Sequence, residues 1–130
     1  MDDNQSVEQR IAKMNRDVAA FQRAGKIKEG VELADEAFFT ALSELPDGNF
    51  IRCQSIRNRA IMQQMSGDMA EAAKTFLVAL SCYKRTLKAC ARRREELEKS
   101  GKIPDALQAA KEQASLARTV EKLQHTLFGG

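Results

Sequence analysis

The sequence predicts an all-α protein, and three observations support this fold class. Strong helix formers such as Ala, Glu, Lys, Arg, Gln and Leu dominate the 130 residues, whereas β-branched residues are scarce. Only two Pro and seven Gly occur, and the glycines interrupt apolar patterns of helical period. A composition of 43% hydrophobic and 30% charged residues is ordinary for a globular chain. We therefore expect a single domain over residues 1–130 with about five helices and with residues 1–5 disordered.

The first two helices are expected over residues 6–23 and 27–45. In the first helix, Ser6 and Gln9 have the spacing of a capping box. Its apolar residues recur at steps of three and four, namely Val7, Ile11, Met14, Val18 and Phe21. An Ala-Gly pair ends this helix. The second helix has an apolar face of the same kind, and the loop sequence Pro-Asp-Gly-Asn at residues 46–49 follows it.

The other three helices are expected over residues 50–65, 69–99 and 104–127. Gly67 separates the first two of these three helices. No Gly or Pro interrupts residues 69–99, and the apolar spacing stays in phase, which favours one long helix over two helices broken near residues 81–85. The sequence Gly-Lys-Ile-Pro comes next, in which the Gly ends the long helix and the Pro suits the first turn of the last helix.

Three stretches of the chain share one pattern around a helix-to-helix turn. Gly25, Gly67 and Gly101 lie 42 and 34 residues apart. An apolar residue follows two positions after each Gly, and a small residue follows five positions after it. The apolar residues are Ile27, Met69 and Ile103, and the small residues are Gly30, Ala72 and Ala106. Because a helix pair buries its apolar face only against neighbouring pairs, we expect stacked antiparallel helical hairpins.

This pattern resembles the tetratricopeptide repeat (TPR) over roughly residues 10–115. The match is best across residues 53–84, where Ala60, Gly67, Ala72, Phe76 and Ala79 stand at the family's positions. The flanking units depart further from the family, with Gly30 and Gln113 at positions where it has Ala. Lys84 replaces the Pro that often closes a unit. The resemblance implies two to three degenerate units in a right-handed array, and a simple helical bundle is the alternative.

In this family, the first helix of each unit lines a concave groove that binds extended or helical segments of other proteins. Carried over by position, the resemblance implies the partner-binding residues Arg16, Gln54, Arg57, Asn58, Ile61, Met65, Lys88 and Arg92. Arginine binds carboxylates through two parallel hydrogen bonds, so the implied ligand is an acidic segment. The amide of Asn58, with its donor and acceptor, suits a peptide backbone. If residues 69–99 form one helix, Lys88 and Arg92 leave this groove.

The sequence thus indicates a protein-binding scaffold, adaptor or chaperone-like module rather than an enzyme. His125 is the only histidine, and the acidic residues do not cluster with His or Cys at the spacing of metal ligands. Each Gly in the helical region stands outside the patterns of phosphate-binding loops. We therefore expect no catalytic residues, no metal and no cofactor.

Two alternatives remain open. Residues 84–94 contain six basic residues and no acid, as a nucleic-acid-binding surface requires, although Tyr83 is the only aromatic residue nearby. These basic residues are Lys84, Arg85, Lys88, Arg92, Arg93 and Arg94. The second alternative is a structural role with a homodimer through the last helix. That helix carries an Ala stripe and a separate stripe of Leu116, Val120, Leu123 and Leu127.

Three features of the chain suggest a cytoplasmic protein that does not bind membranes. No apolar run reaches the roughly 20 residues that span a bilayer. The first ten residues are polar and acidic, unlike a signal peptide. The cysteines, Cys53, Cys82 and Cys90, are odd in number and contain no C-x-x-C pair, which argues against a disulfide framework. We expect all three to be small buried hydrophobes.

Overall fold

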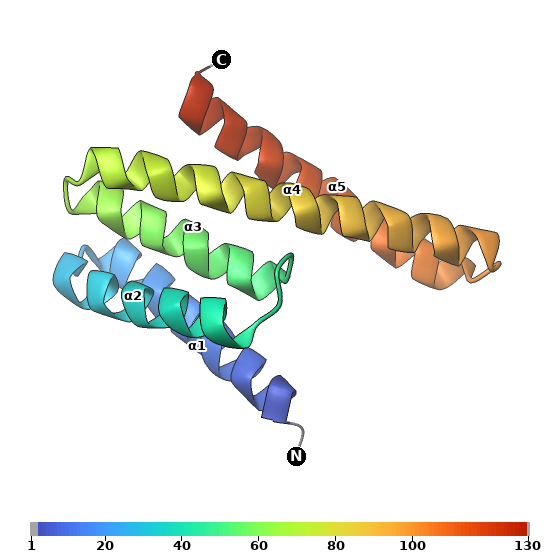
Figure 1. Cartoon of the computed structure of the whole chain (residues 1–130), viewed down its shortest axis with the longest axis horizontal. Coiled ribbons are helices and arrows are strands. Elements are labelled where there is room, and N and C mark those ends of the chain that lie inside the picture. The colour runs from blue at the N-terminus through green and yellow to red at the C-terminus, as the bar shows by residue number, and fades with distance from the viewer. Residues whose placement is uncertain (1–2, 130) are drawn as a thin grey trace. The chain divides into compact units, whose positions relative to one another are not determined.

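The computed structural model describes residues 3–129, which form five α-helices (Figure 1). The helices are α1 (Asp3–Ala24), α2 (Ile27–Glu44), α3 (Phe50–Met65), α4 (Met69–Lys99) and α5 (Ile103–Phe128). The described residues contain no strand, so the all-α prediction is confirmed. Helix α1 begins three residues before the predicted Ser6, because the polar residues 3–5 extend the helix without adding to its apolar period. The rest of the segment expected to be disordered, residues 1–2, lies outside the described residues.

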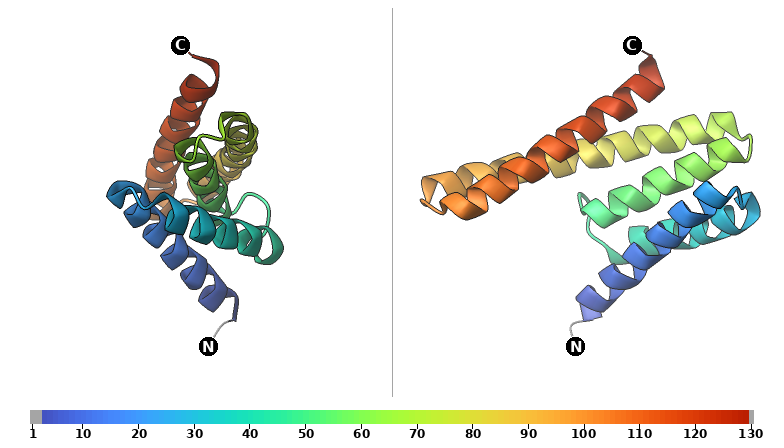
Figure 2. Two further views of the ribbon diagram at one scale, coloured as in Figure 1. Left: turned by 90° about the vertical axis from the view of Figure 1, so that its left-hand side faces the viewer. Right: turned by 180° about the vertical axis from the view of Figure 1, so that it is seen from behind.

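The chain divides into two compact units, Met1–Ala79 (unit 1) and Leu80–Gly130 (unit 2). In unit 1, α1 and α2 form one antiparallel hairpin, and α3 forms a second hairpin with the start of α4 (Figure 2). Unit 2 contains the rest of α4 and α5. Helix α4 is a single helix of 31 residues, as its uninterrupted apolar spacing predicts. The assignment of residues 1–130 to a single domain stays a prediction.

The three turns that share a sequence pattern also share one hydrogen-bond geometry. Gly25, Gly67 and Gly101 have φ values of 70°, 90° and 74°, which a residue without a Cβ adopts at little cost. At each turn the Gly N–H bonds to the carbonyl three residues earlier, and the next N–H bonds to the carbonyl five residues earlier. This double bond pattern is the Schellman motif, which satisfies the last carbonyls of a helix. The repeated turn in the sequence therefore produces the same helix ending three times.

The core of unit 1 is built jointly by α1, α2 and α3. One cluster consists of Ile11, Ala41 and Leu45, with Val7 and Ile51 packed against it. A second cluster consists of Val18, Ala34 and Met62, with Val31, Leu33 and Met65 packed against it. In both clusters a small Ala of α2 faces larger side chains, so the helices approach closely. Fully burying a Val, Leu, Ile or Met side chain contributes about 1.5–3 kcal/mol, and such burial holds these helices together.

Gly30 marks a particularly close approach within unit 1. A Cβ atom added at Gly30 would lie 2.6 Å from Met62 Cε and 3.0 Å from Met62 Sδ. The Met62 side chain is fully buried, so its end would have to shift within the core to admit this Cβ. The small residue five positions after the turn glycine is therefore explained by packing at this turn.

Two arginines of α3 connect it to α2. Arg52 donates from Nη1 to the carbonyl of Leu45, at 2.9 Å, and this contact stabilises the C-terminal end of α2. Arg59 Nε lies 3.0 Å from Asp35 Oδ1. Its guanidinium carbon also lies 4.3 Å from the centre of the Phe38 ring, within cation–π range. Both contacts hold α3 against α2 in addition to the apolar core.

The loop between α2 and α3 is fastened by Asn49. Its Oδ1 accepts from the N–H groups of Ile51 and Arg52, at 2.9 and 3.1 Å, and so caps the start of α3. Its Nδ2 donates to Glu8 Oε1 of α1 at 2.8 Å. One side chain thus joins α1, the loop and the first turn of α3.

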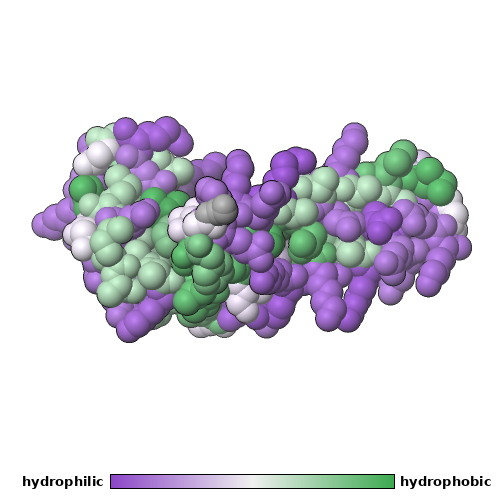
Figure 3. All heavy atoms as spheres, turned by 90° about the horizontal axis from the view of Figure 1, so that it is seen from above, coloured by the Kyte–Doolittle hydropathy of each residue, from purple (hydrophilic) through white to green (hydrophobic). Residues whose placement is uncertain are grey.

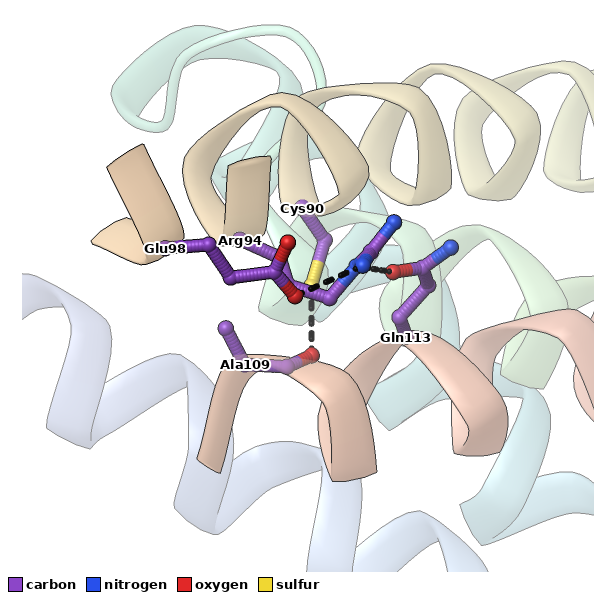
Figure 4. A network of polar contacts seen from close by, with 5 residues as sticks. All are labelled: Cys90, Arg94, Glu98, Ala109 and Gln113. Atoms are coloured by element: carbon purple, nitrogen blue, oxygen red, sulfur yellow. Dashed lines mark hydrogen bonds and ion pairs between the residues drawn. The ribbon is translucent and has the colours of Figure 1, made fainter. Parts of the chain in front are cut away.

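Unit 2 is held in part by polar contacts between α4 and α5 (Figure 4). The Cys90 thiol donates to the carbonyl of Ala109 at 3.4 Å. Arg94 donates from Nε to Gln113 Oε1 at 2.6 Å, and its Nη1 lies 2.8 Å from Glu98. Next to this network, Arg93 forms an ion pair with Glu112. Arginines of α4 therefore reach across to α5 in this hairpin.

The cysteines differ from the sequence prediction. Cys53, Cys82 and Cys90 are all buried, as expected of small hydrophobes. However, Cys53 and Cys82 are disulfide-bonded, and only Cys90 carries a free thiol. The expectation that no cysteine forms a disulfide is therefore wrong for Cys53 and Cys82, because an odd count of cysteines does not exclude disulfide bonds.

The described surface combines hydrophilic side chains with separate apolar patches. On the face shown in Figure 3, hydrophobic side chains gather in patches between hydrophilic ones. Exposed apolar residues of the two last helices are Met69, Leu77, Val78, Ile103, Leu107 and Phe128. By contrast, Leu116, Val120 and Leu123 of the predicted α5 stripe are buried. The homodimer through the last helix stays an untested alternative.

Candidate partner-binding groove

A groove of about 370 Å³ lies between α1 and α3 in unit 1. Its lining consists of Ala12, Asn15, Arg16 and Ala19 from α1, and of Gln54, Arg57 and Asn58 from α3. Within each helix these residues are separated by steps of one, three and four, so each helix contributes one face. The groove is therefore formed by the first helices of the two hairpins of unit 1.

Buried hydrogen bonds connect the two walls of this groove. The Ser55 hydroxyl lies 3.0 Å from Asn15 Oδ1, and Asn15 Nδ2 donates to the carbonyl of Ile51 at 3.4 Å. Asn58 Nδ2 donates to the backbone carbonyl of Asn15, also at 3.4 Å. Asn15 and Ser55 are both buried, and a buried polar group without a partner would cost about 1–3 kcal/mol. The network therefore favours one fixed arrangement of α1 against α3.

The groove is positively charged. Arg16 and Arg57 are exposed, and within residues 3–129 neither side chain has a hydrogen bond or an ion pair. No carboxylate belongs to the lining. Asp17 follows Arg16 in sequence, but it pairs with Lys13 at 2.9 Å. Two guanidinium groups at the groove are thus available to an anionic ligand.

The groove unites four of the eight residues assigned to partner binding from the sequence. These four are Arg16, Gln54, Arg57 and Asn58. Ile61 and Met65 also belong to α3 and are half-buried, but they are not part of the lining. Met65 packs against the cluster of Val18, Ala34 and Met62, so it contributes to the core.

The other two assigned residues, Lys88 and Arg92, are exposed on the part of α4 that belongs to unit 2. Helix α4 is continuous from Met69 to Lys99, so these residues do not begin a separate helix. An unbroken helix over residues 69–99 is the case in which Lys88 and Arg92 are expected to lie outside the groove of a standard repeat.

Three residues of the lining were missed by the sequence argument. Asn15 lies four residues after Ile11 and three before Val18, which is a position on the apolar face of α1. A polar residue at such a position was a signal for a buried polar contact. Ala12 and Ala19 carried no comparable signal, because alanine is common on every face of these helices.

The described part of the chain holds neither a cluster of metal ligands nor a membrane-spanning helix. Residues 3–129 contain no group of three His, Cys, Asp or Glu side chains that could hold a metal ion. Among the described helices, none has the length and apolar character needed to cross a membrane. No protein-family model, curated protein or solved structure matches the chain.

Proposed function

We propose that this chain is a protein-interaction module that binds an acidic segment of a partner protein in the groove between α1 and α3. The observation that carries this proposal is the lining of the groove. Arg16 comes from one helix and Gln54, Arg57 and Asn58 come from another, yet all four line the same surface. The resemblance of the turns and small residues to the TPR family supports the same role. In that role the chain is an adaptor or scaffold, without catalysis and without a cofactor.

The residues of the groove have complementary roles in this proposal. Arg16 and Arg57 bind carboxylates, for which the planar guanidinium offers two parallel donors. Asn58 Nδ2 is engaged by Asn15, so its Oδ1 accepts a hydrogen bond from a peptide N–H. Ala12 and Ala19 leave space for the main chain of the ligand because their side chains are short. A segment with carboxylates on one side and free backbone groups matches this lining.

The test uses a short fluorescent peptide rich in Asp and Glu, with its Gln and Asn analogue as the uncharged probe. The variant Arg16→Glu with Arg57→Glu should lose binding of the acidic peptide, because both attractive charges become repulsive. The matched control is Arg10→Glu with Lys28→Glu, which makes the same charge change at exposed residues outside the groove lining. Fluorescence anisotropy measures binding, and the helical CD signal verifies the fold.

The control separates a specific groove from general attraction between opposite charges. We expect the control to keep most of its affinity, and the uncharged peptide to bind weakly to all three proteins. If the two double variants lose affinity equally, the groove is not the binding site. The proposal also fails if the wild type does not bind the acidic peptide at low salt.

A further inference from the structure

The basic run of α4 contains two kinds of side chain in the structure. Arg93 and Arg94 are engaged by Glu112, Gln113 and Glu98. By contrast, Lys84, Lys88 and Arg92 are exposed, and within the described residues none of these three side chains has a hydrogen bond or an ion pair. The structure thus separates cations that hold the hairpin together from cations that remain at its surface.

The three exposed cations lie on one face of α4. They are four residues apart, so each stands about one turn after the previous one. At 1.5 Å per residue, the distance along the helix from Lys84 to Arg92 is about 12 Å. Residues 81–92 contain no Asp or Glu, and the first acids that follow are Glu95 and Glu96. This face, called here the α4 cation stripe, therefore has no acid between Lys84 and Arg92, and Glu96 follows one turn after its end.

The net charge of unit 2 is positive, like the charge of the α4 cation stripe. Residues 80–130 contain eleven Lys and Arg against six Asp and Glu, a net charge of +5. Residues 1–79 contain ten against twelve, a net charge of −2. Unit 2 is therefore the part of the chain with a net excess of positive charge.

We propose that the α4 cation stripe binds the phosphate backbone of duplex DNA without reading its sequence. Duplex DNA carries one negative charge for about every 1.7 Å of its axis, so several phosphates lie within the length of the stripe. Two of the three cations are lysines, which act as flexible point charges and need no defined carboxylate geometry. This chemistry differs from that of the groove in unit 1, and the inference does not depend on the proposed function.

The side chains around the stripe favour a duplex over a single strand or a membrane. Single-strand binding relies on bases stacking on exposed aromatics, but Tyr83, the aromatic residue of this segment, is buried. Insertion into a membrane surface requires large apolar side chains on the binding face. The exposed large apolar residues of unit 2 are Ile103, Leu107 and Phe128, and all of them belong to α5. The stripe therefore offers contacts to phosphates, but no stacking surface for bases and no apolar side chains for a membrane.

The experiment measures anisotropy of a fluorescent DNA duplex over a range of salt concentrations. In the variant with Lys84→Gln, Lys88→Gln and Arg92→Gln, affinity at low salt should fall about tenfold or more. The log–log salt slope should fall by about 2.7, since each lost phosphate contact removes about 0.9. A charge-preserving variant with Lys84→Arg, Lys88→Arg and Arg92→Lys should keep the affinity and slope of the wild type.

A matched variant on α5 removes the same charge elsewhere in unit 2. Lys111, Arg118 and Lys122 are exposed and, among the described residues, without an ion pair. Changing all three to Gln should reduce the slope much less than changing the stripe. An equal reduction would show diffuse attraction and overturn the assignment to α4. The proposal is also overturned if the wild type fails to bind the duplex at low salt, or binds only vesicles of anionic lipid.

Discussion

The two units use basic side chains in different ways. In unit 1, Asn15 and Ser55 form buried hydrogen bonds between the walls of a groove that carries two exposed arginines, although the unit as a whole has a net charge of −2. In unit 2, with a net charge of +5, Arg94 forms a partly buried contact across a helical hairpin, and other cations are exposed along one helix face. Net charge therefore does not tell where exposed cations lie, because the unit with the negative net charge also carries exposed arginines.

The largest expected effect concerns the cysteines and is all-or-none. In the unfolded, non-reduced protein, a thiol reagent should label only Cys90, because Cys53 and Cys82 are disulfide-bonded. After reduction, all three cysteines should be labelled, and mass spectrometry of the labelled protein gives both counts. Labelling of three thiols before reduction would contradict the disulfide and agree with the reducing compartment expected from the sequence.

The next effect tests the core of unit 1. Met62→Ala should lower the free energy of unfolding by about 2–5 kcal/mol, because it removes a fully buried side chain and leaves a cavity beside Val18 and Ala34. Met69 is 57% exposed, so Met69→Ala should change stability by less than about 0.5 kcal/mol. Chemical denaturation measures both variants. Similar losses in the two would argue against the packing described for Met62.

The close approach of α2 and α3 at Gly30 allows a test of the energetic coupling between Gly30 and Met62. Gly30→Ala improves helix propensity by about 1 kcal/mol, but its Cβ would collide with Met62 in the wild type. In the Met62→Ala background the collision is absent, and Gly30→Ala should then be stabilising by about that amount. The double-mutant cycle gives the coupling energy between the two positions. Additive effects would show that Met62 moves aside freely.

An effect smaller than that of Met62→Ala is expected from the buried polar network of the groove. Ser55→Ala should cost about 1–3 kcal/mol, because Asn15 Oδ1 loses its donor in a buried site. Ser115 is exposed on α5, so Ser115→Ala is the matched control and should be close to neutral. Thermal and chemical unfolding both report the difference. A neutral Ser55→Ala would mean that the network does not fix α1 against α3.

The smallest effect is expected from the surface contacts of unit 2. Arg93 and Glu112 are both about half exposed, so water screens their ion pair. Arg93→Gln should therefore cost less than about 1 kcal/mol, and the loss should shrink further at high salt. Equilibrium unfolding at two salt concentrations measures it. A loss larger than that of Ser55→Ala would reverse the comparison between the units.

The helices could be predicted closely because their ends have local causes. Turn glycines such as Gly67 and Gly101 set the ends of α3 and α4, and an unbroken apolar period identified α4 as one helix. The start of α1 could not be predicted, since residues 3–5 add no apolar repeat. The disulfide state of Cys53 could not be predicted either, because it depends on which residues meet in space.

Part of the candidate groove could be predicted from the sequence, because helical periodicity is a local property. Periodicity assigned Arg57 and Asn58 to the exposed side of α3, and Arg57 is exposed whereas Asn58 is half-buried and bonds to Asn15 of α1. Periodicity does not tell how far along α3 the groove extends, and Met65 packs in the core instead of lining the groove. Nor does it tell which cations find partners. Arg93 and Arg92 are neighbours in one basic run, but only Arg93 reaches a carboxylate.

The fastening of the loop at residues 46–49 has a consequence for engineering this protein. Its composition suggests a convenient place to insert a tag, yet Asn49 ties it to Glu8 and to the first turn of α3. Extra residues there would pull on those bonds and shift α3 along α1, so the insertion would alter the groove instead of remaining silent. At the α4–α5 turn, by contrast, the Ser100 hydroxyl donates back to the carbonyl of Glu96 in α4. The α4–α5 turn is therefore the better insertion point, provided that the helix-ending bonds around Gly101 are kept.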